Sequence, residues 1–228
     1  MVKPWRLSPL ILLVAVAACR QPEVRTRFLR SETYEFSRTE RATIDRIAVA
    51  TAAEVRKLLP GLPAQLEVTA RPGTDVIGEI GADAAAMPPN AVMWTVNPAH
   101  GAGVGAIAER ELRATLFHEF HHLVRSNAEG PRSVLDRAVL EGMATAFERD
   151  FAGAARPWGE HPPEGSGWEA ELLDHATKGS TIAEGRRWFL YRTGTAWVDR
   201  ATAKSGRTSA DLVGTPAVDV LKLAGVAP

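Results

Sequence analysis

The chain of 228 residues has a single cysteine, Cys19. One thiol excludes an internal disulfide and a zinc site built from several cysteines. The sequence after residue 19 is free of cysteine, so a thiol nucleophile is excluded there as well. Any chemistry in that part of the chain must use His, Glu, Asp, Tyr, Arg or Ser.

An excess of charge of either sign is also lacking. Lys and Arg together number 27, as do Asp and Glu, and the formal net charge is +0. A basic excess usually accompanies nucleic-acid binding, so we expect no nucleic-acid partner. The hydrophobic share of 45% and the charged share of 24% are those of an ordinary globular protein. The length suits one domain, or one domain with an appendage.

The apolar run near the N-terminus, "LSPLILLVAVAA", is too short to cross a bilayer, which takes roughly 20 residues. It follows a basic start with Lys3 and Arg6 and ends in small residues, which is typical of a secretory signal peptide. The letters "VAAC" resemble the lipobox of bacterial lipoproteins, in which cleavage leaves the cysteine as the lipidated first residue. We therefore expect a lipoprotein-type signal peptide over 1–19. The alternative is a plain signal or an N-terminal anchor, with Cys19 incidental.

Lipid on Cys19 would attach the protein to a membrane through its acyl chains and place it in the cell envelope. Residues 20–36 are then expected to form a tether, and residues 37–228 a single domain. The sequence shows no internal repeat and no low-complexity tract that would divide this domain further.

Hydrophobic patterning predicts strands in the first half of this domain and helices in the second. A helix ending at Pro60 and Gly61 comes first. The following residues predict strands at 64–70, 76–81 and 91–98, with a loop at 84–90. Further helices are predicted at about 107–126, from about 133, at 168–178, at 182–205 and near the chain end. This order indicates the α+β class.

The stretch "TLFHEFHHLVRS", residues 115–126, contains the motif H-E-x-x-H at His118, Glu119 and His122. In this motif the histidines bind zinc and the glutamate is the general base. His118 and His122 lie about 40° apart on a helical wheel. Both can therefore point a ring nitrogen at one ion about 2.0–2.1 Å away. The alternative is a polar helix edge with two unpaired histidines.

A third ligand must come from another part of the chain. The extended pattern H-E-x-x-H-x-x-G-x-x-H fails, because Arg125 replaces the glycine and Ala128 the last histidine. Glu141, nineteen residues after His122, lies at the edge of an apolar stripe on the next predicted helix, where a carboxylate is costly unless it is paired or bound to metal. Asp136 and Glu148 are rival ligands, and a surface position for Glu141 is the alternative.

The motif H-E-x-x-H followed by "LEGMA" on the next helix resembles the gluzincin class of zinc metallopeptidases. The variant "HEFHH" is similar to a family of predicted bacterial zinc proteases, over roughly residues 92–150 and more loosely through the C-terminal helices. The resemblance implies a zincin-like fold and one Zn²⁺ ion held by His118, His122 and Glu141. It also implies Glu119 as the base and a peptide or protein as the substrate.

Three further residues are candidates for supporting roles. His121 could contact substrate or orient a ligand, or it could pack between helices. Asp136 could hold a ligand histidine by its other nitrogen, or it could simply begin a helix. Tyr191 could stabilise the oxyanion of a tetrahedral intermediate, with a core aromatic position as the alternative.

The predicted strand 91–98 occupies the chain position of the edge strand that pairs with extended substrate in zincin folds. An ordinary strand within the sheet is the alternative.

The rival to the whole enzyme hypothesis is an envelope lipoprotein that binds metal or a partner protein and catalyses nothing. An intact Glu119 argues against this rival, because a purely structural zinc site needs no base and usually has four protein ligands.

Overall fold

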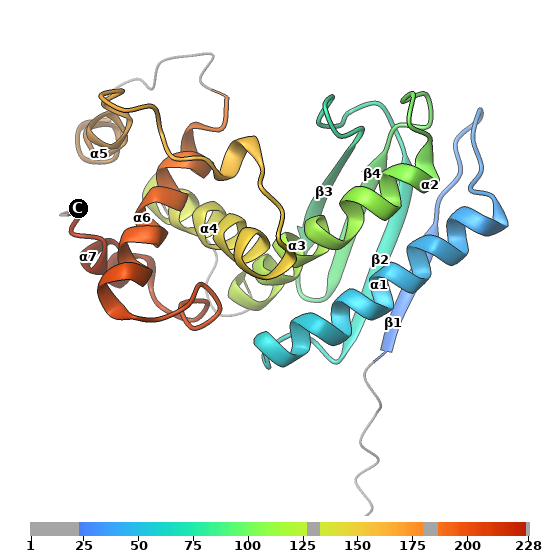
Figure 1. The fold of residues 1–228 in the computed structure, drawn as a ribbon, viewed down its shortest axis with the longest axis horizontal. Helices are drawn as coiled ribbons and strands as arrows, with labels where there is room; N and C mark the ends of the chain where they lie inside the picture. The colour runs from blue at the N-terminus through green and yellow to red at the C-terminus, as the bar shows by residue number, and fades with distance from the viewer. Residues whose placement is uncertain (1–22, 127–132, 180–186, 227–228) are drawn as a thin grey trace, which may run out of the picture.

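The computed structural model describes residues 23–126, 133–179 and 187–226. The predicted signal peptide and Cys19 lie outside the described residues. A small sheet lies at one side of the molecule and the C-terminal helices at the other, with the motif helix between them (Figure 1). The architecture is α+β and mostly helical, as the sequence predicts.

The sheet has four strands in the order β1-β2-β4-β3. Strands β1 (Glu23–Phe28), β2 (Gln65–Pro72) and β4 (Ala91–Val96) are parallel, with Glu23 opposite Gln65. Strand β3 (Ala82–Met87) pairs antiparallel with β4 and forms one edge of the sheet. One outer side of β3 is therefore left without a partner among the described strands.

Helix α1 (Arg38–Leu58) covers part of the sheet. It begins with a capping box in which the Ser37 side chain accepts from the Glu40 amide and the Glu40 carboxylate accepts from the Ser37 amide. Its buried face is apolar at helical spacing, and this face packs with the sheet and with the motif helix. The buried apolar residues of this face are Ile44, Ile47, Ala48, Ala52 and Val55.

The motif helix is continuous but not uniform. It starts as α2 (Val104–Ile107), continues as a π-helical segment, η1 (Ala108–Leu112), and ends as α3 (Arg113–Ser126). Helix α3 contacts α1, β3 and β4 on one side and α4 on the other. It is buried all round, which explains why apolar residues occur on most of its faces.

The C-terminal part forms a second apolar core. Helix α4 (Val134–Phe147) continues as the π-helical segment η2 (Glu148–Ala152), and packs against α6 (Phe189–Ser205). Helices α5 (Trp168–Lys178) and α7 (Ala217–Leu223) complete this core. None of the described helices combines the length and the apolarity needed to cross a membrane.

Several sequence predictions need correction. The tether expected over 20–36 is wrong for its described part, because 23–28 is strand β1 and Phe36 is buried in the core. The segment 76–81 is a turn with one isolated bridge, and the predicted loop 84–90 contributes most of β3. The strand 91–98 is not at the edge, because β4 pairs on both sides.

Candidate metal centre

Two helices bring three side chains to a common point. His118 and His122, one turn apart on α3, place their Nε2 atoms 2.9 Å from each other. Glu141 on α4 places Oε2 3.4 Å from Nε2 of His118 and 3.2 Å from Nε2 of His122. Among the described residues, this is the one group whose side chains are arranged to hold a metal ion.

The spacing of these atoms fits a tetrahedral zinc site. Ligands at 2.0–2.1 Å from a tetrahedral ion lie roughly 3.3–3.4 Å from one another. The three measured distances lie at or slightly below this value, so binding needs only a small expansion. Oε2 of Glu141 is buried and has no hydrogen-bond partner among the described residues, as expected of an atom that faces a ligand. The donor set, two imidazoles and one carboxylate, is also one that zinc accepts.

The charges of the three side chains depend on one another. Burial lowers the pKa of His118, but the neighbouring carboxylates, Glu141 and Glu148 first, outweigh it and raise the pKa to about 10. Burial raises the pKa of Glu141, but the two imidazoles outweigh it and hold this pKa well below its ordinary value. The metal-free centre therefore carries an anionic Glu141 beside a protonated His118.

Glu119 lies next to this centre and faces strand β3. Its side chain is buried, and burial raises its pKa, although His118 and His122 partly oppose the rise. The backbone amide of Ala86 on β3 donates toward its carboxylate. A carboxylate with a raised pKa beside a metal site is suited to accept and return a proton.

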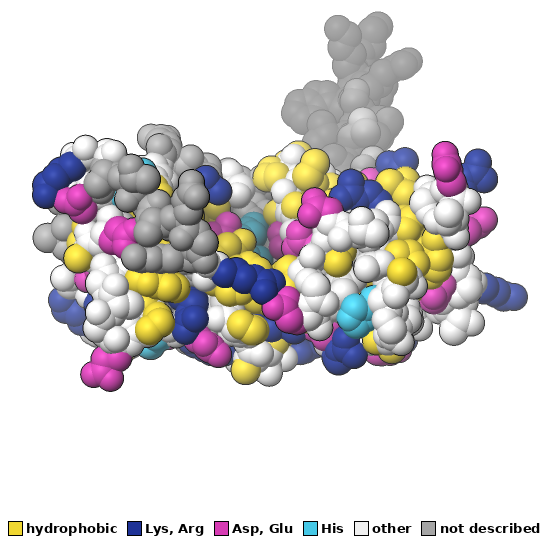
Figure 2. Space-filling view, turned by 90° about the horizontal axis from the view of Figure 1, so that it is seen from above, with side chains coloured by type: hydrophobic (Ala, Val, Ile, Leu, Met, Phe, Trp, Pro, Cys, Tyr) yellow, Lys and Arg dark blue, Asp and Glu magenta, His cyan; other side chains and the backbone are white. Residues whose placement is uncertain are grey.

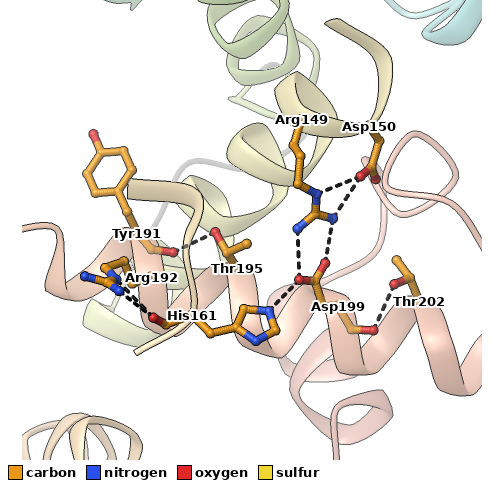
Figure 3. A network of polar contacts seen from close by, with 8 residues as sticks. All are labelled: Arg149, Asp150, His161, Tyr191, Arg192, Thr195, Asp199 and Thr202. Carbon is orange, nitrogen blue, oxygen red and sulfur yellow. Dashed lines mark hydrogen bonds and ion pairs between the residues drawn. The ribbon is translucent and has the colours of Figure 1, made fainter. Parts of the chain in front are cut away.

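Tyr191 reaches the same place from α6. Its ring is stacked near that of His118, with centroids 6.2 Å apart and planes at 22°. Burial raises its pKa first, and the carboxylates of Glu141 and Glu119 raise it further, so the phenol stays protonated. The phenol points away from the polar network on the other side of α6 (Figure 3). The structure thus brings Tyr191 to the candidate centre, and its aromatic packing partners include Trp188.

His121 does not face the cleft. Its side chain is completely buried, and its ring packs on that of Phe147 with centroids 5.4 Å apart. Burial lowers its pKa well below the ordinary value, so the imidazole is neutral. Of the two predicted positions, the structure shows the one packed between helices. Helix α3 contacts α4 as well as α1 and the sheet, so the side that carries His121 is covered.

Asp136 begins a helix. Its amide donates to Ser133 Oγ, and its carboxylate accepts from the Ser133 amide in a second capping box. Nδ1 of His122 has no hydrogen-bond partner among the described residues, so Asp136 does not hold that ring. The predicted contact between Asp136 and a ligand histidine is therefore not present in the described part of the chain.

The carboxylate beside a ligand histidine is instead Glu148. Its Oε2 lies 3.4 Å from Nδ1 of His118, the nitrogen that faces away from Glu141. Its Oε1 accepts a hydrogen bond of 2.9 Å from Nε of Arg156, whose Nη1 also contacts Glu111. At this distance Glu148 is an ion-pair neighbour of the ring, in the position from which a carboxylate can orient a ligand imidazole.

The sequence made Glu148 a rival ligand, gave Glu111 no role and gave no indication of Arg156. Both glutamates lie in π-helical segments, η2 and η1, which shift the helical register. Two buried acids near a metal motif, with one arginine in the following loop, are the signal that could have found the group.

The centre opens into a cavity of about 230 Å³. His118, Glu119 and Tyr191 line it, together with Asp83 and Ala84 of β3. Figure 2 shows a hollow near the middle of the molecular surface, between the sheet and the C-terminal helices, with histidine and acidic side chains visible in it. A substrate can thus reach the candidate centre from solvent.

Residues 89–222 match the family described as "Predicted Zn-dependent protease (DUF2268)". The chain belongs to this family. The matched region is more than half of the chain and includes the three candidate ligands, Glu119 and Tyr191, but not strands β1, β2 and β3. The chain has no significant match among curated proteins or solved structures.

Proposed function

We propose that this protein is a zinc-dependent peptidase of the gluzincin type with a zincin-like fold. The observation that carries the proposal is the meeting of Nε2 of His118, Nε2 of His122 and Oε2 of Glu141 within 3.4 Å, beside a buried Glu119. Membership of a family of predicted zinc proteases supports it. When bound, zinc would lower the pKa of a water molecule and polarise a peptide carbonyl.

The residues of the chain then have separate tasks. Glu119 accepts a proton from the attacking water and returns it to the leaving amine. Tyr191 donates a hydrogen bond to the oxyanion that develops on the carbonyl oxygen. Glu148 holds the ring of His118 in one orientation. The cavity is also lined by the carboxylates of Asp83, Glu119 and Glu148, of which Glu148 is paired with Arg156.

An extended substrate has a strand to pair with. Strand β3 is at the edge of the sheet, and its residues Asp83 and Ala84 line the cavity. Its unpaired backbone groups can bind a peptide by strand addition, which accepts many sequences. The edge-strand role expected of β4 thus falls to β3 in this proposal.

Replacement of Glu119 tests the peptidase proposal. Glu119→Gln should lower the hydrolysis of a mixed peptide pool by about 10²–10⁴-fold, because a general base contributes roughly that factor. The zinc content should stay at one ion per chain. Glu109→Gln is the matched control, because Glu109 lies exposed in η1 and pairs with Arg46. Equal hydrolysis by the parent and the Glu119→Gln variant would show that the base is assigned wrongly.

The rival hypothesis is a lipoprotein that binds metal or a partner protein without catalysis. It predicts a zinc-loaded protein that cleaves no peptide in the same pool.

We also propose that Cys19 carries lipid and anchors the protein in the cell envelope, on the strength of the "VAAC" pattern alone. Labelling of the parent, but not of Cys19→Ala, by a fatty-acid analogue in a bacterial host tests this.

A further inference from the structure

The cavity beside the candidate metal centre has an apolar end. Trp158, in the short helix η3 (Pro157–Gly159), and Trp188, at the start of α6, pack with ring centroids 5.0 Å apart. Ile77 and Ile80, in the turn between β2 and β3, line the same cavity. We call these four side chains the tryptophan pocket. They join His118 and Glu119 in one cavity, so a group bound there lies next to the reacting atoms.

The loop that carries Trp158 is fixed at both ends. Before it, Arg156 contacts the buried Glu148 and Glu111, and its guanidinium lies 5.5 Å from the Trp158 ring. After it, Figure 3 shows the side chain of His161 directed at Asp199 of α6, at 2.6 Å, and Arg192 donating to the His161 carbonyl at 2.7 Å. Trp158 is therefore a fixed wall of the pocket and not part of a loose loop.

Trp188 has an unusual backbone conformation and lies beside an exposed ion pair. Its φ of 66° lies in the left-handed region, which a bulky residue adopts rarely and mainly at functional sites. The guanidinium of Arg187 lies 4.8 Å from its ring and makes two contacts with Glu79, at 2.5 and 2.9 Å. Glu79 belongs to the same turn as Ile77 and Ile80, so this ion pair connects the two sides of the tryptophan pocket.

We propose that the tryptophan pocket binds a large apolar side chain, aromatic or branched, of the substrate residue next to the scissile bond. This inference rests on the proposed peptidase function and names the substrate class of the same site. The walls are apolar and pre-formed, so they gain contacts with such a side chain without reorganisation. The carboxylates of Asp83 and Glu119 line the same cavity and disfavour an acidic side chain.

Cleavage of a position-resolved peptide pool by the zinc-loaded protein tests the inference. We expect Phe or Leu to exceed Ala by about 10–200-fold in kcat/KM at one position flanking the scissile bond, since apolar pockets discriminate to about that extent. Glu at that position should be cleaved least. A flat profile at both flanking positions would overturn the tryptophan pocket while leaving the peptidase proposal intact.

Two variants locate the preference. Ile80→Ala removes one wall, and Trp188→Gly removes another at a φ that glycine adopts without strain. Each should reduce the Phe-to-Ala ratio at least about fivefold, because the lost wall no longer excludes water from the apolar side chain. Val49→Ala, an exposed apolar position on α1, is the matched control and should leave the ratio unchanged.

A binding measurement separates this inference from the peptidase proposal. Calorimetry of the Glu119→Gln variant with uncleaved peptides should give at least about tenfold tighter binding for Phe than for Ala at the selected position. Binding with this preference, but no cleavage by the parent, would sustain the pocket and overturn the peptidase. Equal affinity for both peptides would overturn the pocket, whether or not the parent cleaves them.

Discussion

The phenol of Tyr191 lies where a neutral hydrogen-bond donor is useful. Burial and two nearby carboxylates raise its pKa, so it keeps its proton at any pH at which the protein would work. Its ring lies beside that of His118, and both side chains line the cavity. The position of Tyr191 thus agrees with the donor role better than with that of an ordinary core aromatic.

Removal of this hydroxyl should slow catalysis without weakening substrate binding. We expect Tyr191→Phe to lower kcat about 10²–10³-fold with little change in KM, as for loss of an oxyanion donor. Tyr34→Phe is the natural control, because Tyr34 is the other tyrosine of the chain and donates to Glu40 at the start of α1. A tenfold rise in KM with an unchanged kcat would instead assign Tyr191 to substrate binding.

Single residues differ in how far sequence could place them. His118 and His122 are one helical turn apart, and this spacing alone brings their nitrogens together. Glu141 could be proposed from its position in the next amphipathic helix, although Asp136 and Glu148 competed with it. His121 was ambiguous because its surroundings depend on α4, which supplies Phe147. Burial by another element is not encoded in the local pattern.

At the level of elements, the packing of α4 on α6 depends on two glycines. Gly142 of α4 and Gly194 of α6 face each other backbone to backbone. A Cβ atom on Gly194 would overlap the carbonyl of Ala138, and one on Gly142 would overlap the backbone of Gly194. This close approach brings Tyr191 of α6 toward Glu141 of α4, so it helps to assemble the centre.

Gly194→Ala should therefore destabilise the protein. We expect a loss of at least about 1–3 kcal/mol in the free energy of unfolding, because the overlap is with backbone that cannot rotate away. Urea unfolding followed by tryptophan fluorescence measures it. Gly214→Ala is the control, since nothing lies within 4 Å of the point that its Cβ atom would occupy, and it should change stability by less than about 1 kcal/mol. Equal stability of both variants would contradict the close approach.

The elements themselves were predictable to different degrees. The helix at 168–178 matches its predicted bounds, because a clear apolar period lies between glycines. Strand β3 was missed because "ADAAAM" has little strand propensity, and its conformation is stabilised by pairing with β4. The two π-helical segments were also missed, since a pattern read at 3.6 residues per turn does not indicate them.

At the scale of the whole molecule, metal binding should depend strongly on pH. In the metal-free protein the pKa of His118 is raised to about 10, so its ring is protonated at neutral pH, whereas zinc requires the neutral form. The raised pKa of His118 stabilises the folded metal-free protein, because the folded state binds the proton more tightly than the unfolded state. This contribution to the free energy of unfolding is fully present below the ordinary pKa of 6.5 and is lost as the pH rises through about 10. The low pKa of Glu141 contributes stability above 4.5 that is lost in acid.

The stabilisation conferred by zinc should therefore grow with pH between about 6.5 and 10, because proton competition for His118 weakens over that range. The difference in Tm between zinc-loaded and chelator-treated protein measures this effect. Calorimetry in buffers of different ionisation enthalpy should show proton release on zinc binding at pH 7. His118→Asn is the control and should show neither effect. A Tm difference that is independent of pH would contradict a protonated His118.

The two ends of the sheet have consequences for orientation at a membrane. Glu23 begins β1 and lies opposite Gln65, the first residue of β2. The turn with Ile77 and Ile80 follows the other end of β2. Strand β2 has eight residues, so these two ends of the sheet are roughly 26 Å apart. Cys19 precedes Glu23 by four residues, which span at most about 14 Å. An acyl chain on Cys19 would hold one pole of the molecule at the bilayer and turn the mouth of the cavity toward the aqueous side. If the protein is the proposed peptidase and carries the proposed lipid, its cavity would face polypeptides that approach through water.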